Sequence, residues 1–205
     1  MLKKILYINA CVRQNSRTKR LADCLISCLE GETEEIRLEN MDFGVSDESF
    51  IKERIWLLAK GEYDHPMFSL ARTFAAADLI VIAAPYWDLS FPAALKQYFE
   101  KVNAIGITFF YDEAGQPRGL CKARKLYYVT TAGGPIDSDA FGYGYVKALA
   151  ETFYGIPETE RISLENLDLD GADAEAMLRE AVRSLRKRMQ GSGSGKKGKT
   201  EEDRG

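Results

Sequence analysis

The feature that most constrains this chain is an unbroken apolar run from Leu79 to Ala84, which lies between Asp78 and Pro85. A run so short, and so rich in Ile and Val, is typical of a strand buried on both faces of a parallel sheet. Strand pairing ends at Pro85, because proline has no N–H to donate. We therefore place this segment at the centre of an α/β sheet.

An aromatic loop and a helix follow this strand. Tyr86 and Trp87 begin the loop, Ser90 is a candidate helix N-cap, and Pro92 suits the first helical turn. The helix continues to Val102. Such a loop lies at the carboxyl end of a parallel strand, where open α/β sheets bind ligands.

Strand and helix patterns alternate along the chain. The predicted strands are Lys4–Asn9, Glu34–Leu38, Leu79–Ala84, Lys125–Thr131 and Glu160–Leu164. The other predicted helices are Thr18–Leu29, Ser49–Lys60, Pro66–Ala76, Tyr145–Tyr154 and Asp173–Met189. An extended piece, Thr108–Tyr111, precedes a turn-rich segment, Asp112–Gly119. The alternation predicts an α/β fold: a flavodoxin-like, doubly wound, five-stranded parallel sheet in the order 2-1-3-4-5, with helices on both faces.

The composition fits one domain followed by a polar tail. The chain has 205 residues, of which 45% are hydrophobic, enough for a full core. We assign residues 1–189 to the domain. Residues 190–205 are rich in Gly, Ser and Lys and contain no apolar side chain to bury, so we expect them to be disordered.

The charge and the apolar runs exclude several classes of partner. The net charge is −3, which does not suggest binding to nucleic acid or to an anionic membrane. No run approaches the roughly 18 apolar residues of a membrane span. The apolar start of the chain is too short for a signal peptide and lacks a cleavage pattern. We expect a cytoplasmic protein.

The four cysteines form no CxxC motif, and His65 is the only histidine. We expect Cys11, Cys24, Cys28 and Cys121 to be buried free thiols, and we predict no metal site. His65 precedes a proline at the start of a helix, so we interpret it as a cap or surface residue without a catalytic role.

The loop after the first strand, Ala10 to Thr18, leads into a helix whose N-terminus offers free N–H groups and a partial positive charge. Ser16 and Thr18 add hydroxyls, and Arg13 and Arg17 add guanidinium groups, so a phosphate suits this place. The alternative is an ordinary N-cap with solvated arginines. No P-loop motif and no GxGxxG motif occurs here.

Two further loops should reach the same edge of the sheet. Tyr86 and Trp87 could form a wall for a flat conjugated ligand, or they could pack on a helix or at a subunit contact. Gly133 and Gly134 allow a backbone to approach a ligand closely, or they could form a plain turn. A phosphate pocket, an aromatic wall and a glycine edge together describe a site for flavin mononucleotide (FMN).

Several motifs make the chain resemble the FMN-dependent NAD(P)H:quinone oxidoreductases of the azoreductase family, which have a flavodoxin fold. They include Ile82-Ala83-Ala84-Pro85, Pro92–Glu100 (PAALKQYFE), Gly106–Tyr111 (GITFFY), and the strand that ends in a Gly133-Gly134 loop. The C-terminal FYGIPETERISLENL is also similar to the family. The resemblance spans about residues 1–189.

The resemblance implies FMN as cofactor, NADH or NADPH as electron donor, and a quinone or azo compound as acceptor. It also implies a homodimer with active sites at the subunit interface, and chemistry carried by flavin N5 rather than by a catalytic side chain. The residues that it implies for cofactor binding are Cys11, Ser16, Arg17, Thr18, Pro85, Tyr86, Trp87, Asp88, Leu89, Thr131, Ala132, Gly133 and Gly134.

Three positions depart from the family pattern. Cys11 lies near a position that is usually serine, Asp88 replaces a usual Asn, and Ala132 stands where Arg is common. A carboxylate can only accept hydrogen bonds, whereas an amide can also donate.

Three alternatives stay open. One is a flavin reductase or nitroreductase of the same fold. Another is a non-catalytic flavodoxin-type electron carrier, which the modest charge and the segment Thr108–Gly119 disfavour. The last is a flavin-free α/β binding module in which Tyr86 and Trp87 contact a protein. By analogy with the family, Thr108–Gly119 is a candidate lid or dimer contact.

Overall fold

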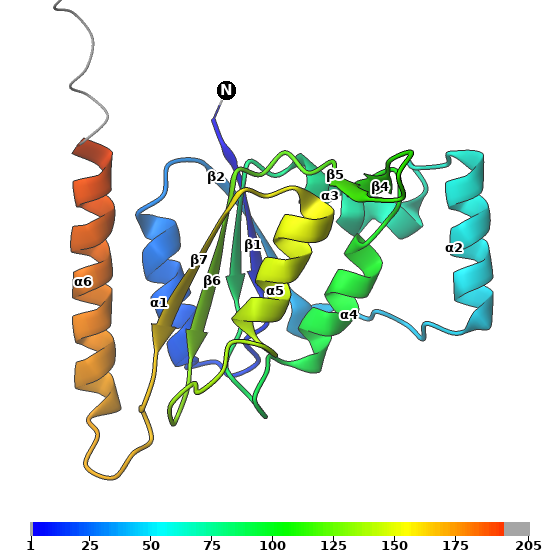
Figure 1. Ribbon diagram of the computed structural model, residues 1–205. Coiled ribbons are helices and arrows are strands. Elements are labelled where there is room, and N and C mark those ends of the chain that lie inside the picture. The colour runs from blue at the N-terminus through cyan, green and yellow to red at the C-terminus, as the bar shows by residue number, and fades with distance from the viewer. Residues whose placement is uncertain (1, 195–205) are drawn as a thin grey trace, which may run out of the picture.

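A computed structural model describes residues 2–194 and is built around one parallel sheet (Figure 1). The strands of this sheet are β1 (Lys4–Asn9), β2 (Glu32–Arg37), β3 (Leu79–Ala83), β6 (Lys125–Thr131) and β7 (Glu158–Leu164). They lie in the order β2-β1-β3-β6-β7, and all neighbours pair in parallel. In chain order this is 2-1-3-4-5, so the predicted fold class is confirmed.

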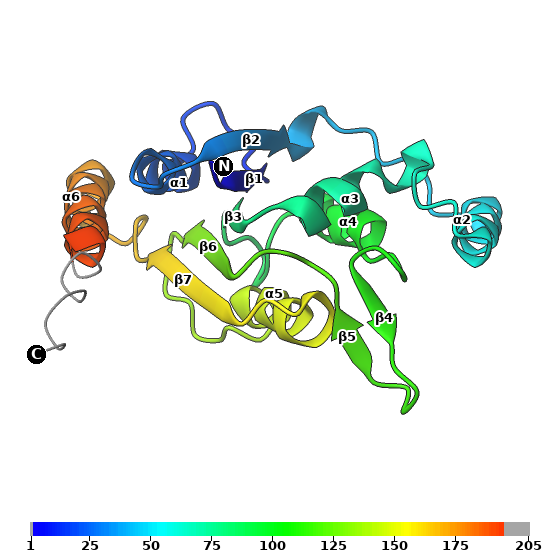
Figure 2. The ribbon, with the colours of Figure 1, turned by 90° about the horizontal axis from the view of Figure 1, so that it is seen from above.

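Helices cover both faces of the sheet (Figure 2). One face carries α1 (Arg17–Ser27) and α6 (Ala174–Ser194). The other carries α3 (Ser69–Ala76), α4 (Ala93–Val102) and α5 (Tyr143–Leu149). Because every crossover returns to the same end of the sheet, all the strands present their carboxyl ends at one edge.

The core consists of two apolar layers, one on each face. Alternate strand residues point to opposite sides of the sheet. Tyr7, Val81 and Val129 therefore pack with α1 and α6, while Ile82 and Tyr128 pack with α4 and α5. Because both faces of the sheet are covered, the central strands are hydrophobic on both sides.

An antiparallel hairpin stands outside the sheet, formed by β4 (Phe109–Tyr111) and β5 (Pro117–Gly119). It packs beside the π-helical turn η3 (Ala150–Tyr154), which continues α5. The approach is very close, because a Cβ added to Gly119 would lie 2.2 Å from the Gly155 nitrogen. The extended piece and the turn predicted for residues 108–119 are thus a hairpin held against the end of α5.

The helix α2 (Glu48–Lys60) is the element farthest from the sheet on its side of the molecule (Figure 1, Figure 2). Asp47 caps its start by accepting from the Phe50 N–H at 2.9 Å, and Gly61 ends it with φ 72°. The Arg54 guanidinium ties it to the end of α4 by donating to the Glu100 carbonyl at 2.6 Å. Leu57 is its buried residue.

Two short 3-10 turns complete the elements, η1 (Leu38–Asn40) and η2 (Pro66–Phe68). His65 is the N-cap of η2, since its Nδ1 accepts from the Met67 N–H at 3.3 Å. This agrees with the predicted capping role of His65.

The prediction that Ser90 caps the helix after β3 is wrong. That helix, α4, begins at Ala93 with Pro92 in the N-cap position and no side-chain cap. The Ser90 hydroxyl instead donates to the Phe141 carbonyl at 2.5 Å. The Ser90 hydroxyl thus joins the loop after β3 to the segment before α5.

Element boundaries differ from the predictions at a few ends. Leu38 starts η1 rather than ending β2, and β7 starts two residues earlier than predicted, at Glu158. The helix α6 continues to Ser194, so the first residues of the predicted tail are helical. The rest of that tail, 195–205, lies outside the described residues.

The thiols are free, as predicted, but they are not equally buried. Cys11 and Cys24 are buried, whereas Cys28 and Cys121 are only half-buried. No helix among residues 2–194 is long and apolar enough to cross a membrane.

Candidate functional site

The three predicted loops meet at the carboxyl edge of the sheet, around a cleft of about 330 Å³. The predicted residues that line this cleft are Arg13, Ser16, Arg17, Thr18, Pro85, Tyr86, Trp87, Thr131, Ala132 and Gly133. Cys11, Asp88, Leu89 and Gly134 are not among its lining residues. The structure thus brings residues of all three loops together around one cleft, and four of the predicted residues lie outside its lining.

A larger cavity, about 420 Å³, lies at the opposite end of the strands, beside Lys4, Glu32 and Arg72. We place the site in the smaller cleft, because ligands of open α/β sheets bind outside the carboxyl ends of the strands.

The first wall of the cleft is the N-terminus of α1. Ser16 is the N-cap, and its Oγ accepts from the Lys19 N–H at 3.2 Å. The first N–H groups of a helix have no intrahelical partner. The cap therefore uses one of these donors and leaves the N–H groups of Arg17 and Thr18 for a ligand, at the positive end of the helix dipole.

Thr18 and Thr131 join the start of α1 to the Gly133-Gly134 loop after β6. Their hydroxyl oxygens lie 2.7 Å apart, and both residues are buried, Thr18 with only 1% of its surface exposed. The Thr18 hydroxyl is therefore already engaged within the protein. Its contribution to an anion would come from its backbone N–H.

The aromatic loop is a tight hairpin turn. Trp87 and Ser90 exchange backbone hydrogen bonds of 3.0 and 2.8 Å. The two residues between them, Asp88 and Leu89, have φ of 49° and 67°. Consecutive positive φ values identify a type I′ turn, and in Leu89 this conformation costs about 1–2 kcal/mol.

This turn determines which side chains face the cleft. Asp88 and Leu89 form its exposed tip, while Tyr86 and Trp87 lie at its base and line the cleft. The Tyr86 N–H donates to the Thr131 carbonyl at 3.0 Å, which fixes the aromatic loop beside the glycine loop.

A fourth wall, which the sequence analysis missed, follows β7. Leu167 and Asp168 line the cleft, and the Arg17 Nη1 lies 2.7 Å from the Asp168 Oδ1. The position of β7 in the sheet could have indicated this wall, because β7 also ends at the carboxyl edge. Asn166, with φ 64°, then turns the chain back toward the Gly133-Gly134 loop.

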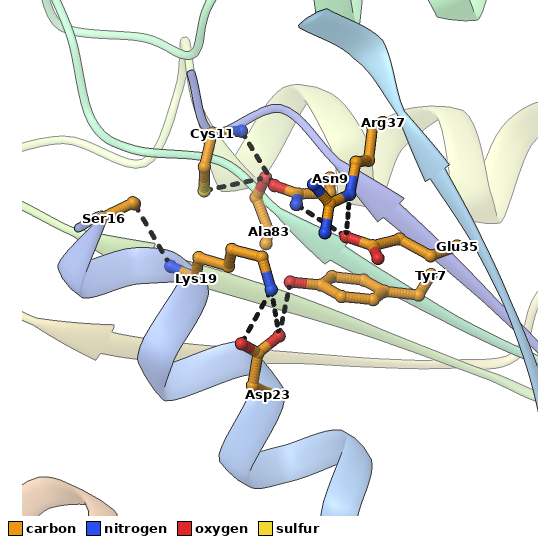
Figure 3. A network of polar contacts seen from close by, with 9 residues as sticks. All are labelled: Tyr7, Asn9, Cys11, Ser16, Lys19, Asp23, Glu35, Arg37 and Ala83. Carbon is orange, nitrogen blue, oxygen red and sulfur yellow. Dashed lines mark hydrogen bonds and ion pairs between the residues drawn. The ribbon is translucent and has the colours of Figure 1, made fainter. Parts of the chain in front are cut away.

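Cys11 does not face the cleft. It is buried, its N–H donates to the Asn9 Oδ1 at 2.9 Å, and its thiol lies near the Ala83 carbonyl (Figure 3). Burial raises the pKa of the Cys11 thiol to about 11, so it is a neutral thiol at physiological pH. Cys11 is therefore a buried packing residue at the start of the loop after β1 and not part of the cleft lining.

The Asn9 side chain makes hydrogen bonds to both the loop after β1 and the neighbouring strand β2 (Figure 3). While its Oδ1 accepts from the loop, its Nδ2 donates to the Glu35 Oε1 at 2.8 Å. Burial disfavours the charge on Glu35, but the hydrogen bonds from Asn9 and Arg37 prevail, and the pKa of Glu35 is lowered. Asn9 thus connects the loop after β1 to the Glu35 carboxylate on β2.

A second polar contact in the same network braces α1. The Lys19 ammonium lies 2.7 Å from Asp23 one turn later, and Asp23 also accepts from the Tyr7 hydroxyl at 3.2 Å. Burial, followed by the charge of Asp23, raises the pKa of Tyr7. Because Tyr7 belongs to β1, this contact ties α1 to the strand that precedes it.

Comparison with known proteins identifies the relatives of this chain. A family model described as flavodoxin-like fold matches residues 3–189. FMN-dependent NADH:quinone oxidoreductase 2 of Clostridium acetobutylicum is 34% identical over 192 residues, covering 88% of this chain and 95% of the relative. The FMN-dependent NADH:quinone oxidoreductase of Coprothermobacter proteolyticus is 33% identical over 201 residues, covering 89% and 96%.

Solved structures share the fold. An azoreductase from Bacillus anthracis str. Sterne superimposes with a TM-score of 0.78 at 20% identity, covering 93% of this chain and 100% of the other. An FMN-dependent NADH-azoreductase from Bacillus anthracis str. Ames Ancestor, in complex with FMN, gives 0.74 at 20% identity, covering 93% and 99%.

Proposed function

Because the chain belongs to the family of FMN-dependent NADH:quinone oxidoreductases with a flavodoxin-like fold, we propose that its cleft binds FMN and that the protein reduces quinones or azo compounds with NADH or NADPH. The observation that carries this proposal is the convergence of a helix N-terminus, an aromatic loop and a glycine loop around one cleft. We also infer that residues 1–189 form the flavin-binding domain, and a cytoplasmic location stays a prediction.

The residues of the cleft fit the groups of FMN. The N–H groups of Arg17 and Thr18, with the Arg17 guanidinium, suit the phosphate, because they supply donors and positive charge at one place. Tyr86 and Trp87 suit the flat ring as its wall. The backbone of the Gly133 loop suits the polar edge of the ring.

Bound FMN would supply the redox chemistry of this proposal, a two-electron ping-pong reaction with hydride transfer at its N5. The chain's own contribution is to bind and orient. Tyr86 and Trp87 limit where a planar substrate can stack. The hydrogen bonds between the loops keep the sides of the cleft in fixed positions relative to one another. No side-chain acid or base is required for this role.

The proposed activity is tested by mixing the purified protein, loaded with FMN, with NADH in a stopped-flow instrument. We expect loss of the flavin absorbance within about a second, in the range of turnover typical of enzymes, followed by recovery when a quinone is added. Absence of bleaching over minutes would contradict an oxidoreductase and favour an electron carrier.

Substitution of Trp87 tests the aromatic wall in the same protein. We expect Trp87→Ala to weaken FMN binding about tenfold, because ring stacking contributes roughly 0.5–1.5 kcal/mol beyond burial. Trp87→Phe, which keeps a flat ring, should retain most of the affinity. Wild-type FMN affinity in Trp87→Ala, measured by fluorescence titration, would show that the ring binds elsewhere.

We further propose that the protein is a homodimer that uses the outer side of α2. Ile55 and Trp56 are 61% and 58% exposed, and Ile51 on the same helix is also exposed. Phe110 and Tyr111 are exposed as well, and β4, which carries them, lies on the side of the molecule away from α6, as α2 does. Exposed apolar side chains on one side of a molecule favour a protein contact there, and the family resemblance supports a second copy as the partner.

Ile55→Glu tests this contact. We expect the variant to sediment as a monomer under conditions in which the wild-type protein is a dimer, because a buried unpaired charge at an interface is costly. Ser49→Glu, which adds the same charge on another side of α2, should leave the dimer intact. A wild-type monomer, or a dimer that Ile55→Glu does not change, would contradict the proposal.

A further inference from the structure

The contact between Arg17 and Asp168 spans the cleft from α1 to the segment after β7. The two charged atoms lie 2.7 Å apart, and the side chains are 36% and 65% exposed. Among residues 2–194, Asp168 is the only carboxylate that lines the cleft. It therefore places a negative charge beside the group of donors at the N-terminus of α1.

The backbone holds Asp168 in this position. Its N–H donates to the Gly133 carbonyl at 2.9 Å, and the Leu167 N–H donates to the Ala132 carbonyl at 3.2 Å. A Cβ added to Gly133 would lie 2.5 Å from the Asp168 Oδ2. The absence of a side chain at Gly133 thus leaves the space in which the carboxylate lies, so the contact is built into both loops.

A bound phosphate would need the same guanidinium. Arg17 belongs to the first turn of α1, whose free N–H groups favour an anion at that place. A carboxylate already bonded to Arg17 removes one of the strong donors, and its charge repels a phosphate brought close to it. The two anions therefore compete for the Arg17 guanidinium, although Arg13 also lines the cleft.

We propose that Asp168 is a specificity-determining residue, which competes with the phosphate of the flavin for Arg17 and so limits the preference of the cleft for FMN over riboflavin. This inference rests on the proposed function. When FMN binds, the Arg17 guanidinium exchanges its carboxylate partner for the phosphate. Riboflavin, which has no phosphate, leaves the pair undisturbed.

The test compares flavin binding to the apoprotein of the wild type and of Asp168→Asn, by quenching of flavin fluorescence. We expect Asp168→Asn to bind FMN about tenfold more tightly, because it frees Arg17 and removes one repulsive charge. Its affinity for riboflavin should stay within about twofold of the wild type, since no phosphate is involved. Asp170→Asn, which removes an exposed charge two residues along the chain and outside the cleft lining, should change neither affinity.

Weaker or unchanged FMN binding by Asp168→Asn would overturn the inference and show that Asp168 positions Arg17 or has no part in binding. A parallel increase for riboflavin would overturn it as well. If the wild-type protein binds neither flavin, the proposed function fails, and inorganic phosphate then tests the competition by itself. In that case a larger rise in melting temperature with phosphate for Asp168→Asn than for the wild type supports the competition, and an equal rise refutes it.

Discussion

Replacing Ser16 by Asp is expected to weaken FMN binding by at least about 100-fold while leaving the stability of the apoprotein nearly unchanged. Asp is as good an N-cap as Ser, and Ser16 acts in the fold as the cap of α1. The new carboxylate would lie in the lining of the cleft, where we place the phosphate. Two like charges about 4 Å apart repel by roughly 4 kcal/mol at an effective dielectric constant near 20.

Ser16→Asn is the matched control, because Asn is also a good N-cap but adds no charge. Melting temperatures of both apoproteins should agree with the wild type within a few degrees, and only Ser16→Asp should be purified without colour. Full FMN affinity in Ser16→Asp would mean that the phosphate does not bind at the start of α1.

Gly119→Ala is expected to destabilise the protein by about 3 kcal/mol, the upper end of the usual cost of overpacking. A Cβ at this position would lie 2.2 Å from the Gly155 nitrogen and from the Tyr154 carbonyl carbon, both of which are backbone atoms that cannot rotate away. The hairpin of β4 and β5 would have to move off η3. For a protein of this size we expect the melting temperature to fall by about 10 °C.

Gly134→Ala serves as the control for this prediction, since a Cβ there would meet no atom within 4 Å. Thermal unfolding of the two apoproteins should differ by several degrees, with Gly134→Ala close to the wild type. A Gly119→Ala variant as stable as the wild type would show that the hairpin does not pack against Gly155.

The sheet order could be predicted from sequence because each central strand is a short apolar run that alternates with a helical pattern. Such a run is typical of a strand covered on both faces. Once the strands were placed, topology predicted that the loops after β1, β3 and β6 meet at one edge, and they do. The family model and the relatives confirm the family resemblance as well.

Details within the loops could not be predicted, because they depend on contacts between distant segments. Ser90 looked like a cap, but it bonds to Phe141 across a gap of 51 residues. Asp88 and Leu89 occupy the tip of a type I′ turn, although neither is the Gly that such turns favour. No local pattern indicated that Asp168 would pair with Arg17, 151 residues away.

Ile51, Ile55 and Leu58 recur at helical spacing along α2, but this pattern does not indicate what covers the residues. Periodicity shows that residues share one side of a helix, but not what covers that side. In the structure Leu57 packs inward while Ile51 and Ile55 remain exposed. A subunit contact, as proposed above, would account for this pattern.

The most direct measurement of the central claim is a crystal structure of the protein grown with FMN. The account predicts density for the phosphate at the backbone N–H groups of Arg17 and Thr18, and for the ring between the Tyr86–Trp87 wall and the Gly133 loop. Flavin bound at the opposite end of the strands, beside Lys4 and Arg72, or a phosphate away from the N-terminus of α1, would contradict it.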